Sequence, residues 1–151
     1  MRIQNNWIVV LGISLLVAFS VQAAMLSPLV DAASRGDINA VRDLLRDGAE
    51  VNDMQGDGMT ALHWAAEIGN AQLADMLIYA GSNTEAGTRI GQYTPLHIAS
   101  RNGQGHIVQT LVDTGANVHA KTTNSGTTAL HLAAISGDEQ SVAALIEAGA
   151  D

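Results

Sequence analysis

The sequence of 151 residues contains no cysteine, only two prolines and 3% aromatic residues. Without cysteine, the chain has no disulfide, no thiolate ligand for zinc and no cysteine nucleophile. Basic residues are also scarce, since seven Lys and Arg stand against fifteen Asp and Glu. Nucleic acids bind proteins through basic side chains that neutralise phosphates, so we expect no nucleic-acid partner.

Residues 1–23 have the order of a secretory signal peptide. Arg2 supplies a positive start, an apolar run covers residues 7–19, and small or short residues precede a cleavage site after Ala23. The run is short for a membrane helix, which needs ~20 apolar residues. We therefore expect a periplasmic or secreted protein whose mature domain is residues 24–151. An uncleaved N-terminal anchor is the alternative, and the only case in which we expect membrane attachment.

The rest of the chain repeats itself with a period of 33–34 residues. A Thr-x-Leu-His motif occurs three times, and its histidines stand 34 residues apart both times. Two series of glycines recur with the same period, which indicates an array of similar units. The residues of the motif and of the glycine series are Thr60, Leu62, His63, Thr94, Pro95, Leu96, His97, Thr128, Leu130 and His131, with Gly36, Gly69, Gly103 and Gly137, and Gly48, Gly81, Gly115 and Gly149.

Each unit is predicted to form two short helices. In the third unit, Thr94 is the expected N-cap of a helix that runs from Pro95 to about Asn102. A second helix is expected over about residues 106–114, with Gly115 as its left-handed C-cap. Residues 117–120 should then lead out in extended form. Because such a helix pair cannot bury both faces alone, neighbouring units are expected to stack.

In motif and period, the units resemble ankyrin repeats, whose signature is T-P-L-H-x-A at about 33 residues. The resemblance implies an all-α solenoid of stacked helix-turn-helix units joined by short β-hairpins. About four units are expected, over residues 27–54, 55–86, 87–120 and 121–151. The first unit has Val30 in place of the histidine, as expected of a capping unit. At Asp151 an array would continue into another hairpin, so we expect truncation there, or a face covered by a partner or a second copy.

The three motif histidines are predicted to be structural. Neighbours should lie roughly 10 Å apart, the spacing of packed helices, whereas the ligands of one zinc ion lie about 2 Å from it. The resemblance implies that each histidine braces its cap threonine and the neighbouring turn. His106 on the second helix and His119 on the exit segment are expected to be exposed, with pH sensing as the alternative. Since no catalytic motif accompanies them, we expect no metal, no cofactor and no enzymatic activity.

The resemblance also implies a function, because ankyrin-like proteins mainly bind other proteins through hairpin tips and the concave face of the first helices. We therefore expect an exported, non-enzymatic module that binds a protein partner. Two alternatives remain: a membrane-tethered scaffold, and an enzyme or small-ligand binder that uses Glu67 and Arg101 in the concave groove. Trp64 aligns with Ile98 and Leu132 and is expected in the core. The candidate binding residues are Met54, Asp57, Met59, Arg89, Ile90, Tyr93, Asn124 and Ser125 at the tips, and Glu67, Ile68, Ser100, Arg101 and Ile135 on the first helices.

Overall fold

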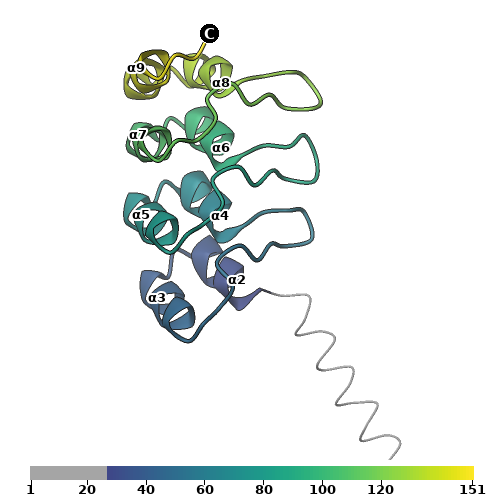
Figure 1. Cartoon of the computed structure of the whole chain (residues 1–151), viewed down its shortest axis with the longest axis vertical. Coiled ribbons are helices and arrows are strands. Elements are labelled where there is room, and N and C mark those ends of the chain that lie inside the picture. The colour runs from purple at the N-terminus through teal and green to yellow at the C-terminus, as the bar shows by residue number, and fades with distance from the viewer. Residues whose placement is uncertain (1–26) are drawn as a thin grey trace, which may run out of the picture.

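A computed structural model of the chain describes residues 27–151, and the expected signal peptide lies outside them. The described residues form eight helices in four consecutive pairs, stacked side by side as a solenoid (Figure 1). The first helices of the pairs form one layer and the second helices form the other (Figure 1). In chain order the pairs are α2 (Pro28–Ser34) and α3 (Ile38–Arg46), α4 (Ala61–Ile68) and α5 (Ala71–Tyr79), α6 (Pro95–Arg101) and α7 (Gly105–Asp113), and α8 (Ala129–Ser136) and α9 (Glu139–Glu147).

The helix boundaries follow from capping residues in each unit. The first helices start after Ser27, Thr60, Thr94 and Thr128, whose hydroxyls accept the N–H of the third helical residue. Each such bond satisfies one of the N–H groups that the first turn of a helix leaves without an intrahelical partner. Gly69 and Gly137 end α4 and α8 in the left-handed conformation, at φ values of 71° and 74°.

One continuous apolar core runs through the stack, from Leu29 in the first unit to Leu145 in the last. Leucines from the first helices alternate with alanines such as Ala65 and Ala99, whose small side chains let neighbouring helices approach closely. Each first helix contacts the first helix of the next unit, and the second helices do the same. The stacking of units is therefore confirmed, with a shared interior in place of four separate cores.

The segments between units differ from the expectation in two respects. Residues 117–120 do not run out in extended form: Val118 and His119 lie in a turn, in which Ala120 N–H bonds to the Asn117 carbonyl at 3.2 Å. The Asn117 side chain accepts the His119 N–H at 3.0 Å and so stabilises this turn locally. In the described residues, the hairpin loops contain no regular strand and one isolated β-bridge, between Met54 and Thr60.

The outer face of the last unit exposes side chains whose counterparts are buried one unit earlier. Leu130 is half-buried although Leu96 is 1% exposed, and His131 is exposed although His97 is 1% exposed. Within the described part of the chain, no unit packs on this face. None of the described helices has the length and hydrophobicity required to cross a bilayer.

Candidate protein-binding groove

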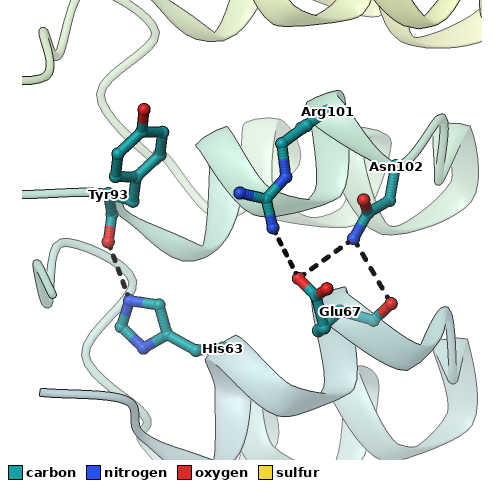
Figure 2. Close-up of polar contacts among 5 residues, drawn as sticks. All are labelled: His63, Glu67, Tyr93, Arg101 and Asn102. Carbon is teal, nitrogen blue, oxygen red and sulfur yellow. Dashed lines mark hydrogen bonds and ion pairs between the residues drawn. The ribbon is translucent and has the colours of Figure 1, made fainter. Parts of the chain in front are cut away.

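The motif histidines connect each helix cap to the following unit. His63 Nδ1 accepts the Thr60 N–H at 3.1 Å and lies 2.8 Å from the Thr60 hydroxyl. Its Nε2 lies 3.0 Å from the Tyr93 carbonyl oxygen in the next hairpin loop (Figure 2). Because a carbonyl can only accept, Nε2 carries the proton, and because Nδ1 accepts an N–H, the imidazole is neutral. Burial lowers the pKa of His63, although the hydrogen bond to the Tyr93 carbonyl opposes this shift.

His97 repeats this arrangement one unit later, and His131 repeats half of it. His97 Nε2 lies 3.1 Å from the Ala120 carbonyl and 3.2 Å from the Thr127 carbonyl, and burial lowers its pKa. His131 Nδ1 lies 2.7 Å from the Thr128 hydroxyl, but the described residues offer its Nε2 no carbonyl. The His131 side chain is correspondingly exposed. The histidines thus lie one per unit along the stack, and residues 27–151 contain no cluster of three possible metal-binding side chains.

The hairpin loops project from the layer of first helices and lie one after another along the stack (Figure 1). Arg89 N–H in the second loop bonds to the Asp57 carbonyl in the first at 2.8 Å, and Thr123 N–H in the third bonds to the Gly91 carbonyl at 3.0 Å. Gly58 permits the first of these contacts. It has a φ of +86°, and an added Cβ would lie 2.7 Å from Arg89 N. Backbone hydrogen bonds therefore join consecutive loops into one continuous surface.

A groove of about 420 Å³ lies between the first two loops and helices α4 and α6. We call it the inter-loop groove. Trp64 on α4 and Ile98 on α6 line it beside the loop residues, and Ile90 is 84% exposed at the loop tip. The groove is thus mainly apolar, with a few polar groups among its lining residues, as is typical of binding sites. The lining residues are Asp57, Met59, Trp64, Glu67, Thr88, Ile90, Tyr93, Ile98 and Arg101.

One ion pair crosses the groove from α4 to α6. Arg101 Nη2 lies 2.7 Å from Glu67 Oε2, and the Arg101 guanidinium lies 6.0 Å from the centre of the Tyr93 ring. Asn102 donates from Nδ2 to the same carboxylate oxygen at 3.2 Å and to the Glu67 backbone carbonyl at 3.3 Å (Figure 2). Glu67 therefore has two partners from the next unit, which fix its carboxylate in place.

The structure brings six of the predicted binding residues together in this groove: Asp57, Met59, Glu67, Ile90, Tyr93 and Arg101. Six others are exposed but do not line it: Met54, Ile68, Arg89, Asn124, Ser125 and Ile135. The prediction for Ser100 is wrong, because this side chain is completely buried. It occupies the position of Ala66, where the neighbouring unit packs.

Three lining residues, Trp64, Thr88 and Ile98, were absent from the predicted binding set. Trp64 was expected in the core, yet its side chain is half-buried and lines the groove, while Ile98 at the same position is 3% exposed. The indole is larger than the isoleucine side chain and is the more exposed of the two. Its size relative to its counterparts was the only signal in the sequence. Asn102 was also missed, because its partners lie on another unit.

A family model described as "Ankyrin repeats" matches the chain three times, over residues 13–88, 29–122 and 81–151. The chain belongs to the ankyrin repeat family. Ankyrin repeats are generally protein–protein interaction modules, and the family is typically non-enzymatic. The bridging histidines and joined loops described above are therefore features of an ankyrin array.

Curated relatives match parts of this ankyrin array. Ankyrin repeat domain-containing protein 40 of Mus musculus and of Homo sapiens is 35% identical over 65 residues, 42% of this chain and 18% of the relative. Palmitoyltransferase AKR1 of Candida glabrata is 37% identical over 62 residues, 39% of this chain and 8% of the relative. Osteoclast-stimulating factor 1 of Sus scrofa is 39% identical over 51 residues, 34% of this chain and 24% of the relative. The matched region is less than a quarter of each of these proteins.

Proposed function

We propose that this chain is an exported, non-enzymatic ankyrin module that binds a protein partner in the inter-loop groove. The observation that carries the proposal is that a mainly apolar groove also contains an ordered ion pair. Ile90 is 84% exposed beside the groove, and the Glu67–Arg101 pair crosses it. Exposed aliphatic and aromatic side chains around a few ordered polar groups are the composition of interaction hot spots.

The same pair supports binding over catalysis. Glu67 Oε2 already accepts from Arg101 and from Asn102, so both charged groups of the alternative enzymatic site are engaged with each other. A catalytic carboxylate requires a site within hydrogen-bonding reach of a reacting atom. Glu67 and Arg101 are instead paired with each other across the inter-loop groove, where they present fixed polar groups to a partner.

Site-specific photo-crosslinking tests the binding site. A photoreactive phenylalanine analogue at Ile90 is expected to give a crosslinked protein partner in cells of the source organism. The matched control is the same analogue at Tyr79, which is 96% exposed on α5 in the layer of second helices. Equal crosslinking from both positions, or none from Ile90, contradicts the proposal.

Export is tested separately by N-terminal sequencing of the mature protein. The proposal expects a periplasmic or secreted species that begins near Ala24. A membrane-bound species that retains Met1 or the apolar residues 7–19 would instead establish the tethered scaffold. This outcome would leave the groove proposal intact, since the groove is built from residues 57–101.

A further inference from the structure

The chemistry of the groove defines the kind of segment that it accepts. Met59, Ile90 and Tyr93 from the loops face Trp64 and Ile98 from the helices across a space of about 420 Å³. This volume lies toward the lower end of the ~300–1,000 Å³ that pockets for small ligands occupy. It therefore suits one or two side chains of an extended peptide, and the lining favours a large apolar side chain.

The charges that line the groove do not cancel. Arg101 and Glu67 neutralise each other at 2.7 Å, which leaves Asp57 as the remaining ionised side chain of the lining. Asp57 is exposed, and in the described residues no cationic side chain forms an ion pair with it. Its Oδ1 accepts the Met59 N–H at 2.9 Å, which holds the carboxylate at the groove wall.

Arg89 is the positive residue whose backbone contacts Asp57 from the adjacent loop, and its side chain does not offset Asp57 inside the groove. Its backbone N–H bonds to the Asp57 carbonyl, but its exposed side chain is not among those that line the groove. The described residues 27–151 carry fifteen acidic and six basic residues in total. The negative electrostatic potential of the whole protein thus adds to the preference of the groove for a cation.

We propose that the inter-loop groove binds an extended peptide segment in which a large apolar side chain lies next to Lys or Arg. The apolar side chain packs against Trp64 and Ile90, and the cation pairs with Asp57. This inference rests on the proposed function and adds to it the chemistry of the partner. A partner segment with an acidic residue beside the apolar anchor would be repelled by Asp57.

A random dodecapeptide phage library, selected on the immobilised full-length protein, tests this inference. The enriched peptides are expected to combine an aliphatic or aromatic residue with an adjacent Lys or Arg. Representative peptides, fluorescently labelled, are then titrated by fluorescence anisotropy. Ile90→Asp is expected to weaken their binding more than ten-fold, because it places a charge at an apolar hot spot.

The charge is tested by Asp57→Asn, which retains an acceptor oxygen for the Met59 N–H. We expect it to weaken binding about two- to five-fold, the range for a solvent-exposed ion pair. Asp53→Asn removes the same charge outside the groove lining and is expected to leave binding unchanged. Circular dichroism and urea midpoints equal to wild type show that the variants are folded.

The outcomes separate the two claims. Peptides that lose binding in Ile90→Asp but bind Asp57→Asn as tightly as wild type overturn the cationic partner and leave the groove as the site. Enrichment of acidic peptides does the same. Tyr79→Asp is the matched control for Ile90→Asp. Equal affinity of the peptides for these two variants overturns both the inference and the proposed function. A library that yields no binder does the same.

Discussion

Arg101 Nη2 lies 2.7 Å from Glu67 Oε2, so a single ion pair joins the first helices of the second and third units. The two residues are 34 positions apart, one repeat length, and therefore occupy the same place in successive units. Asn102 reinforces the junction by bonding to the Glu67 side chain and backbone. The opposite charges are adjacent because the units stack in register (Figure 2).

This ion pair is expected to contribute little to stability. The Arg101 and Glu67 side chains are 46% and 36% exposed, so solvent screens their attraction. A double-mutant cycle with Glu67→Ala and Arg101→Ala should give a coupling energy of less than about 1 kcal/mol in urea unfolding. A coupling energy several times larger would show that the pair holds the array together.

Replacing His97 by alanine is expected to cost far more than replacing His131. The first change removes a buried ring that satisfies the Thr94 cap and contacts the Ala120 and Thr127 carbonyls. We expect a loss of roughly 2–4 kcal/mol from the free energy of unfolding. His131→Ala removes only the cap contact at an exposed position and should cost roughly 1 kcal/mol. Equal losses in the two variants would contradict the role of the inter-unit hydrogen bond.

The buried histidines are expected to make the fold sensitive to mild acid. Burial lowers the pKa of His63 and His97 below the ordinary value of 6.5, so the unfolded chain binds protons more readily than the folded chain. Their stabilising contribution is therefore complete above pH 6.5 and is lost as the pH falls toward the lowered pKa. Protonation of either ring would also place a hydrogen on its Nδ1. That nitrogen could then no longer accept the Thr60 or Thr94 N–H.

Urea midpoints measured between pH 7.5 and 5.5 check this prediction. The wild-type midpoint should fall with pH, and a His63→Gln/His97→Gln variant should show a flatter dependence. His119→Gln, which alters an exposed turn residue, serves as the control and should follow wild type. If the double variant loses stability with acid as steeply as wild type, other groups cause the effect.

Gly58→Ala is expected to destabilise the loops by more than the conformational cost alone. The left-handed conformation costs a residue with a Cβ about 1–2 kcal/mol, and at Gly58 the new carbon would also lie 2.7 Å from Arg89 N. Gly126→Ala is the matched control, since Gly126 has a φ of +66° and open space around it. Thermal unfolding should therefore show a larger loss for Gly58→Ala, and identical losses would rule out the steric contact.

Some features of this fold could be predicted because the residues that form them are only three or four positions apart in the sequence. Thr94 and His97 are separated by three positions, so the capping motif identifies the helix start without reference to the rest of the chain. The period then predicts stacking, because a helix pair of this size cannot bury its apolar face alone. The turn at Asn117 was missed, although an asparagine side chain that bonds two residues ahead is also a local signal.

Features that join two units could not be predicted from one unit. Ser100 looked like a surface position, but the next unit covers it completely. The groove lies between two loops of different units, which are joined by the backbone contact between Asp57 and Arg89. Trp64 and Ile98 both line this groove, although their position in the repeat alone indicates the core.

The hydrogen bonds between consecutive loops have a consequence for the thermodynamics of association. Free loops must lose conformational entropy when a partner orders them, and that loss subtracts from affinity. Here the Asp57–Arg89 and Gly91–Thr123 backbone bonds order the tips before any partner arrives. A partner of modest contact area therefore meets a preorganised surface, and most of its interaction energy is retained as affinity.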